Sequence, residues 1–176
     1  ESVSGDHFYM VGETFTGDIV AYDQYGNLID TDSGTQLRGA AERSSIDFLP
    51  DIMTLSAGRA SFAAFDTLAG ANRIRVQTLG GTDLSGWSEV LTISPAAAYR
   101  IVEVRGDSLG VHVGAQVALE TRVSDRYGNV VPSEIVRFVI TSDLGGTPSL
   151  WDATGAPDDG LVLTNASGAA VCSLTT

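Results

Sequence analysis

Apolar and polar residues alternate in many short stretches of this 176-residue chain. A period of two residues is typical of β-strands with one buried face, because successive side chains of a strand point to opposite sides. Glycine, asparagine, aspartate and serine separate the stretches and supply turns. The alternating segments are residues 15–21, 74–76, 91–93, 99–104, 136–140 and 170–174. No comparable helical period is present, so the pattern predicts an all-β fold of the sandwich or barrel type.

The alternating pattern occurs in two similar copies. Residues 12–30 align without a gap on residues 114–132, so that the string Asp-x-Tyr-Gly-Asn appears once in each half of the chain. Further along, a turn glycine followed by small and apolar residues occurs at Gly58 and again at Gly168. Such self-similarity indicates two tandem copies of one domain. We expect the boundary at Pro95, which gives a first domain of residues 1–95 and a second of residues 96–176.

The two copies differ at the outer ends of the chain. The alternating segment 99–104 precedes the second turn, whereas its counterpart before the first turn would fall ahead of Glu1. Segments 72–77 and 89–93 follow Gly58, whereas the chain stops soon after Gly168. We therefore expect the first domain to lack its leading strand and the second its last strands. Neighbouring repeats or copies of the same protein would then complete the sheets by adding strands.

The repeated string has the chemistry of a tight turn. An aspartate carboxylate accepts backbone N–H groups, and glycine and asparagine tolerate positive φ. The residues predicted to form these structural turns are Asp23, Gly26 and Asn27 in the first domain and Asp125, Gly128 and Asn129 in the second. A Ca²⁺ ion bound by Asp23 or Asp125 is the alternative interpretation, because that ion prefers oxygen ligands.

These motifs resemble the bacterial immunoglobulin-like domains of the invasin and intimin type. The second domain matches the motifs of that family at Asp125, Gly128, Asn129, Pro132, Val136, Phe138, Gly168 and Ala170, and the first at Asp23, Gly26, Asn27, Gly58 and Ala60. The first domain departs from the pattern at Asp32, where the family has proline, and it has no Val-x-Phe strand. The resemblance implies tandem immunoglobulin-like β-sandwiches that serve as spacers or displayed modules in long surface proteins.

Composition and charge exclude several functions. The chain has 22 acidic and 10 basic residues, a net charge of -12, which argues against nucleic acid and anionic membrane surfaces as partners. All ten basic residues are arginine, so Schiff-base chemistry through lysine is excluded. No apolar run approaches the roughly twenty residues needed to cross a bilayer, so direct membrane insertion is not expected.

Cysteine and histidine offer no metal or redox chemistry. Cys172 is the one cysteine of the chain and lies on the apolar face of an alternating segment, so we expect it to be buried. His7 and His112 are far apart in the sequence and lack neighbouring ligands, which argues against a zinc site.

The acidic segment around residue 151 is the strongest candidate for ligand contact. Trp151 stands close to Asp152, Asp158 and Asp159, a set that suits a glycan or a Ca²⁺ ion, although a solvated loop is the simpler interpretation. No nucleophile elbow, phosphate-binding loop or zinc-protease motif is present, so we expect no catalytic residues, no enzyme activity and no cofactor.

Two short strings carry weaker signals. Residues 105–108 are Arg-Gly-Asp-Ser, which contains the Arg-Gly-Asp tripeptide that integrins recognise. Gly106 and Asp107 are also typical of an ordinary turn. Asn165 begins an N-glycosylation acceptor string that coincides with the turn before a strand.

Together these features predict an extracellular structural or spacer module of a long bacterial or archaeal surface protein. A filament or surface-layer subunit completed by strands from its neighbour is the sharper form of this hypothesis. Two alternatives remain open at this point. One is an adhesin module that binds a cell-surface or glycan ligand, and the other is an accessory domain of a secreted glycan-degrading enzyme.

Overall fold

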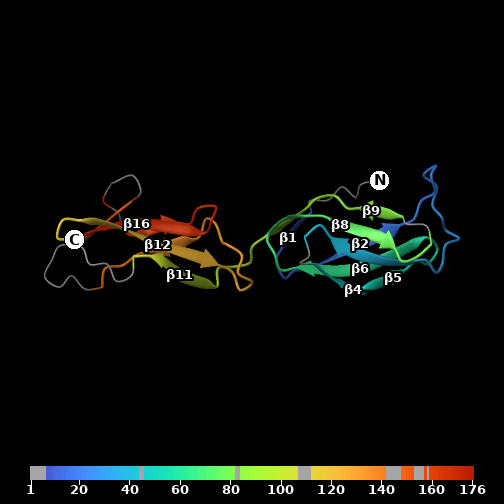
Figure 1. Cartoon of the computed structure of the whole chain (residues 1–176), viewed down its shortest axis with the longest axis horizontal. Coiled ribbons are helices and arrows are strands. Elements are labelled where there is room, and N and C mark those ends of the chain that lie inside the picture. The colour runs from blue at the N-terminus through green and yellow to red at the C-terminus, as the bar shows by residue number, and fades with distance from the viewer. Residues whose placement is uncertain are drawn as a thin grey trace. The chain divides into compact units, whose positions relative to one another are not determined.

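The structure, a computed structural model, describes residues 7–43, 46–81, 84–106, 112–141, 148–152, 157 and 159–176. All the secondary-structure elements within these ranges are β-strands, so the prediction of an all-β fold is confirmed. The chain divides into two compact units, Glu1–Pro95 and Ala96–Thr176, and Figure 1 shows the strands of each.

The first unit holds ten strands within the described residues. In chain order they are β1 (Phe8–Met10), β2 (Thr14–Val20), β3 (Gln36–Ala41), β4 (Ile46–Leu49), β5 (Ile52–Thr54), β6 (Arg59–Asp66), β7 (Gly70–Asn72), β8 (Ile74–Thr78), β9 (Ser85–Trp87) and β10 (Leu91–Ser94). They form sheets in the order β2-β6-β4, β5-β3-β8-β9 and β1-β10-β7.

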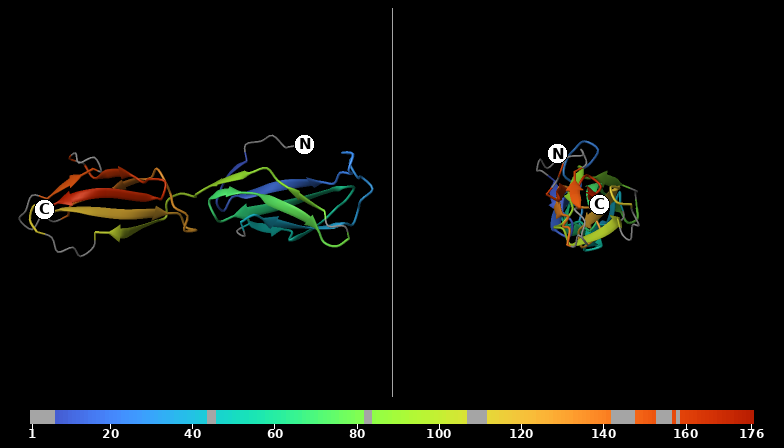
Figure 2. Two further views of the ribbon diagram at one scale, coloured as in Figure 1. Left: turned by 45° about the horizontal axis from the view of Figure 1, so that its top comes forward. Right: turned by 90° about the vertical axis from the view of Figure 1, so that its left-hand side faces the viewer.

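Apolar side chains of alternating positions fill the interior of the first unit. Phe15 of β2, Leu37 of β3, Phe62 of β6 and Ile74 of β8 are all buried. Since these strands belong to different sheets, the period of two seen in the sequence places one face of each strand in a shared core. The two further views in Figure 2 show the strands of each unit running side by side.

Two glycines let aromatic rings fill this core. Gly17 of β2 pairs with Phe62 of β6, and a Cβ atom at Gly17 would lie 2.4 Å from Phe62 Cζ. Gly39 of β3 faces Phe48 of β4 in the same way, with a Cβ atom 2.7 Å from the ring. The Phe48 and Phe62 rings themselves pack in a tilted pair with centroids 5.5 Å apart. The glycines therefore provide the space that the ring pair occupies.

The second unit holds six strands within its described part. They are β11 (Arg100–Arg105), β12 (Gln116–Ser124), β13 (Ile135–Arg137), β14 (Ser149–Trp151), β15 (Leu161–Leu163) and β16 (Ala169–Thr175). The first sheet has the order β11-β12-β16-β14, and the second consists of β13 and β15. Val123, Val131, Val136 and Ala170 form the buried core, against which Phe138 and Val162 pack. Cys172 of β16 is also buried, as the alternation predicts.

One strand is shorter than the sequence predicts. Alternation continues to Ile140, but β13 ends at Arg137. Phe138 N–H still donates to the carbonyl oxygen of Gly160 at 2.7 Å, which continues the register of β13 and β15 by one pair, but Gly160 has a φ of 82° and so leaves the extended conformation of a strand. The ladder therefore ends here, and Val139 and Ile140, which follow Phe138, line a cavity.

The leading segments of the two units differ in their pairing. β1 of the first unit pairs in parallel with β10, whereas β11 of the second unit pairs in antiparallel fashion with β12. As a result, β2 is an edge strand of its sheet, whereas its counterpart β12 lies between β11 and β16. The expectation that outer strands are missing stays a prediction.

Candidate functional site

The two Asp-x-Tyr-Gly-Asn turns have the same internal hydrogen bonds. In the first, Asp23 Oδ1 accepts the backbone N–H groups of Tyr25 and Asn27 at 2.8 and 2.9 Å, and Asp23 Oδ2 accepts Asn27 Nδ2 at 3.0 Å. Gly26 adopts a φ of 85°, which an L side chain rarely tolerates. The predicted turn chemistry is thus visible atom by atom.

In the second unit the turn repeats this arrangement. Asp125 Oδ1 accepts the N–H groups of Tyr127 and Asn129, both at 2.9 Å, and Asp125 Oδ2 accepts Asn129 Nδ2 at 3.0 Å. Gly128 has a φ of 89°. The two turns therefore use the three predicted residue types, aspartate, glycine and asparagine, in the same roles.

The turns differ in one contact and in burial. Asp125 Oδ2 also accepts the N–H of Ala96 at 3.0 Å, a bond between the turn and the first residue of the unit. Asp125 is 2% exposed and Tyr127 37%, whereas Tyr25 is 80% exposed. Asp125 thus fixes the segment that enters the second unit, which sequence analysis did not foresee because Ala96 carries no polar side chain to signal it.

Hydrogen bonding controls the acidity of both carboxyl groups. The side-chain bond from Asn27, followed by the backbone N–H of Asn27, lowers the pKa of Asp23. Burial tends to raise the pKa of Asp125, but hydrogen bonds from Asn129, Ala96 and Tyr127 outweigh burial, and the pKa is lowered. Both groups are therefore carboxylates at neutral pH.

The carboxylate oxygens of the turns face N–H donors. Because a Ca²⁺ ion requires several oxygen ligands around it, the turn geometry favours the structural interpretation. Within the described ranges, no group of three or more His, Cys, Asp or Glu side chains is arranged to hold a metal ion. Calcium binding by Asp23 or Asp125 stays a prediction.

The fold places Trp151 and Asp159 of the acidic segment in different structural elements. Trp151 ends β14, is half-buried, and donates its Nε1 proton to Ser149 Oγ at 2.8 Å. Asp159 Oδ1 accepts the N–H of Leu161 at 3.0 Å, so this carboxylate closes the turn before β15. Asp152 is half-buried next to Trp151, and Asp158 lies outside the described residues.

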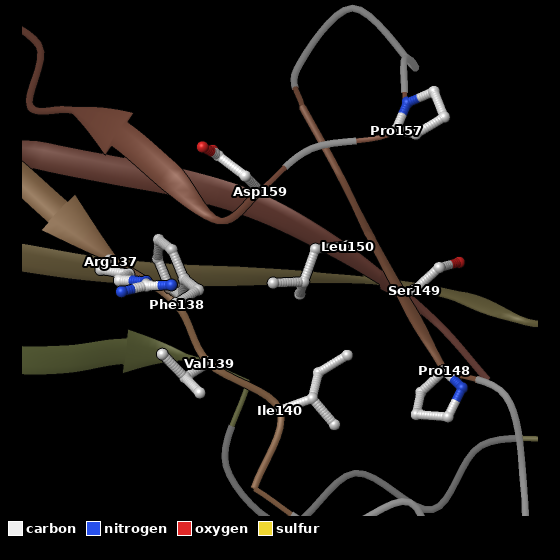
Figure 3. A pocket seen from close by; sticks show the side chains of 9 residues that line it. All are labelled: Arg137, Phe138, Val139, Ile140, Pro148, Ser149, Leu150, Pro157 and Asp159. Carbon is white, nitrogen blue, oxygen red and sulfur yellow. The ribbon is translucent and has the colours of Figure 1, made fainter.

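A cavity of ≈ 360 Å³ lies beside the continuation of β13 (Figure 3). Its lining is mostly apolar, and it includes Asp159 but neither Trp151 nor Asp152. The nine residues around it are Arg137, Phe138, Val139, Ile140, Pro148, Ser149, Leu150, Pro157 and Asp159. The structure therefore does not gather the predicted aromatic and acidic residues into one ligand site.

The remaining sequence signals have structural roles or fall outside the described ranges. Asn165 Oδ1 accepts Ser167 N at 2.9 Å and Ala169 N at 3.1 Å, which shapes the turn before β16. Arg105 is exposed at the end of β11, and Asp107 and Ser108 are not among the described residues.

Sequence analysis missed a buried polar cluster in the first unit. Asp66 and Asn72 are each 1% exposed, and Asn72 Nδ2 donates to Asp66 Oδ2 at 2.8 Å. Asn72 Oδ1 accepts the N–H of Arg43 at 3.1 Å, and the Arg43 guanidinium donates to the carbonyl oxygens of Ala69 and Ala71. The three residues lie on different segments with no shared spacing, so the sequence holds no signal for them.

No protein-family model matches the chain, and no curated protein matches it. Several solved structures are similar. They include the Escherichia coli adhesin FdeC, with 21% identity, 99% of this chain and 54% of that chain covered, and a TM-score of 0.47. The chain thus spans about half the length of the FdeC structure.

Two further structures are similar to the chain. The D0-D1 domain of intimin has 12% identity, with 97% of this chain and 81% of that chain covered and a TM-score of 0.41. The surface layer protein SbsC, domains 4-9, has 16% identity, with 96% and 25% covered and a TM-score of 0.34. Intimin is the protein type that the sequence motifs resemble.

Proposed function

We propose that the chain is a structural module of a surface-exposed protein, in which two β-sandwich units act as consecutive spacers. The observation that carries this proposal is the internal use of the repeated polar residues. In both turns the aspartate and asparagine side chains form hydrogen bonds within the turn, so the repeated motif has a structural role.

Two features of the chain support a spacer role. Ala96 follows Pro95 directly and is already bound by Asp125, so there is no flexible linker of glycine and serine between the units. The net charge of -12 keeps an extended array soluble through self-repulsion.

Surface exposure is tested on the cells that make the protein. Antibodies raised against residues 1–176 should label intact cells, and protease added to intact cells should remove the epitope. Permeabilised cells serve as the control for total protein. Labelling that appears only after permeabilisation would contradict the proposal.

A second proposal is that the second unit accepts an additional strand from another polypeptide segment. β3, the first strand after the turn in the first unit, pairs on both sides, with β5 and β8. β13, the first strand after the turn in the second unit, pairs with β15 alone within the described ranges. An open strand edge is a site for β-augmentation.

Burial of a matched residue pair supports this second proposal. Phe15 and Ala64 face each other across β2 and β6, and both are buried. Their counterparts Val117 and Leu174 face each other across β12 and β16, but both are only half-buried. An added strand beside β13 would cover this apolar face.

A peptide of residues 70–94, the segment that carries β7 to β10, is the probe for strand addition. Added to the full chain, it should increase amide hydrogen-exchange protection across 135–140. A peptide with Ile74→Asp and Val76→Asp, which places charge on the apolar face, is the control. Equal protection with both peptides, or none with either, would reject strand addition.

A further inference from the structure

The sheet β5-β3-β8-β9 of the first unit differs in charge from the rest of the chain. Its four strands contain two arginines, Arg38 and Arg75, and no aspartate or glutamate, although the chain has 22 acidic residues. A further arginine, Arg73, stands directly before β8. The strands of the sheet β2-β6-β4 contain three aspartates and one arginine. Positive charge is therefore a local feature of one sheet in an acidic protein.

The register of the strands places these arginines on the outer face of the sheet. Met53 of β5 and Ile74 of β8 are buried, so the alternate positions of the strands point away from the core. On that outer face Arg75 of β8 lies between Ala40 of β3 and Trp87 of β9, the residues with which it pairs. β8 and β9 lie side by side in Figure 1.

Trp87 is an exposed aromatic side chain on this face. It is 54% exposed at the end of β9. The guanidinium carbons of Arg73 and Arg75 each lie 5.9 Å from the centroid of its ring. Cation–π attraction at this distance favours a fixed position of the indole beside the two cations. A flat apolar surface and positive charge thus occur together.

The two arginines beside Trp87 have donors to spare. No carboxylate of the described residues forms an ion pair with Arg73 or Arg75. Arg75 Nη2 donates to Ser85 Oγ at 3.2 Å, and Arg75 Nε is buried with no hydrogen-bond partner. Because a guanidinium has several N–H donors and no acceptor, both side chains retain donors for an anion.

This face lies on the sheet that a leading strand does not join. In the second unit the leading strand β11 pairs with β12. The counterpart of β12 in the first unit is β2, which belongs to the sheet β2-β6-β4. A strand in the corresponding place extends that other sheet and leaves the outer face of β8 uncovered.

We propose that Arg73, Arg75 and Trp87 form a binding site for an acidic polysaccharide, in which the sugars carry carboxylate groups. The indole provides a flat surface for the C–H face of a pyranose ring. The guanidinium groups bind the sugar carboxylate, whose two oxygens match their planar donors. Gln77 and Ser85, which pair with each other on the same face, offer hydrogen bonds to sugar hydroxyl groups.

The shape and charge of the surface favour this ligand. The site lies on the outer face of a sheet, which suits an extended polymer that makes several weak contacts. The net charge of -12 repels an acidic ligand elsewhere on the protein, so binding is directed to this face. An acidic peptide would use the arginines, but the exposed indole favours a sugar ring. This binding function is additional to the spacer role and does not depend on it.

Isothermal titration calorimetry with the full chain tests the site. The probes are an oligomer of galacturonic acid and an oligomer of sialic acid, which distinguish two sources of carboxylated sugar. We expect at least one of them to bind. The methyl ester of the binding oligomer has the same sugars without the charge and should bind about tenfold more weakly. Poly-L-glutamate of the same length is the probe for an acidic peptide and should also bind more weakly.

Substitutions locate the site on the outer face of β8 and β9. Trp87→Ala should weaken binding about tenfold, and Arg73→Gln and Arg75→Gln should each weaken it several-fold. Arg59→Gln is the matched control, because Arg59 is an exposed arginine at the start of β6 in the other sheet, and it should leave binding unchanged. In a Trp151→Phe background, the fluorescence of Trp87 should change during the titration. Arg73→Gln alters an exposed side chain and keeps the test valid if Trp87→Ala does not fold.

Several results would overturn the site. They are no binding of either acidic oligosaccharide, equal binding of the methyl ester, and equal loss of affinity in Arg59→Gln and Arg75→Gln. Equal binding of poly-L-glutamate would also reject a polysaccharide site, because the indole would then contribute nothing that an acidic peptide does not use. None of these results affects labelling of intact cells, so failure of the site and failure of the proposed surface role are distinguishable.

Discussion

Single residues of the turns and strand starts decide the local backbone of both units. Gly168 has a φ of 70°, and a Cβ atom there would lie 2.7 Å from the carbonyl oxygen of Val123. Gly128 has a φ of 89°, but a Cβ atom there would meet nothing within 4 Å. Substitution of Gly128 therefore tests backbone strain alone, whereas substitution of Gly168 tests backbone strain together with a steric clash.

Gly128→Ala should destabilise the second unit by about 1 kcal/mol, because only the left-handed backbone is strained. Gly168→Ala should cost about 1–3 kcal/mol more, because the new methyl group collides with backbone. Denaturant unfolding is followed through Trp151 in a Trp87→Phe background, which leaves a single tryptophan in the second unit. Equal destabilisation by the two substitutions would contradict the crowding at Gly168.

The acidity of Asp125 makes stability depend on pH. Its folded pKa is lower than the unfolded value of 3.8, so the folded state favours the carboxylate. The resulting stabilisation is fully present above the unfolded pKa and is lost as the pH falls through the folded pKa.

Asp125→Asn should therefore be less stable than the parent chain at neutral pH, and the difference should shrink as the pH falls below 3.8. Unfolding of the second unit at a series of pH values measures this difference. Asp23→Asn, in the other unit, is the control for a general effect of acid on the chain. A difference that stays constant with pH would refute the role of the Asp125 charge.

At the scale of strands, the packing of the first unit depends on glycine opposite phenylalanine. Gly39 of β3 and Phe48 of β4 belong to different sheets, so their contact determines how closely the layers approach. Gly39 does not have a positive φ that would explain its presence, and neither does Gly17, which faces Phe62 in the same way. The requirement is space and not backbone freedom.

Gly39→Val should therefore destabilise the first unit by about 1–3 kcal/mol through overpacking. In the double variant with Gly39→Val, Phe48→Leu should remove part of this destabilisation, because a smaller side chain leaves room for the valine. The double-mutant cycle should then give a favourable coupling energy. Trp87 fluorescence in a Trp151→Phe background follows this unit. Strictly additive effects would show that the two side chains do not compete for the same volume.

At the scale of the whole molecule, charge is strongly unbalanced. The chain has 22 acidic and 10 basic residues, yet the described part forms one ion pair, Arg38–Asp51 at 3.0 Å between exposed side chains. Unpaired acidic groups repel one another in the compact state, and salt screens this repulsion.

Raising the NaCl concentration should therefore increase the melting temperature of the chain. CaCl₂ at the same ionic strength should give the same increase, because the turn carboxylates already accept N–H donors. Differential scanning calorimetry measures both salts. A larger increase with micromolar CaCl₂, reversed by a chelator, would instead support calcium at Asp23 or Asp125.

Local features of the fold were predictable because their causes are local. Alternation predicted strands that the structure contains at 14–20, 91–94 and 169–175. The turn motif predicted the turn-forming roles of Asp23 and Asp125 because the turn N–H groups that they bind lie within four residues. The end of β13 was not predictable from its own alternation, because the positive φ of Gly160, in the partner segment, ends the ladder.

The sequence by itself determined the fold class, the repeat and the turn chemistry, since these depend on periodicity and on contacts between near neighbours. Only the tertiary structure decided that Asp66 meets Asn72 and Arg43, that Asp125 holds Ala96, and that Asp159 lines a cavity apart from Trp151. These contacts join segments far apart in the chain, and their distances follow from how the sheets pack. No pattern of neighbouring residues encodes such distances.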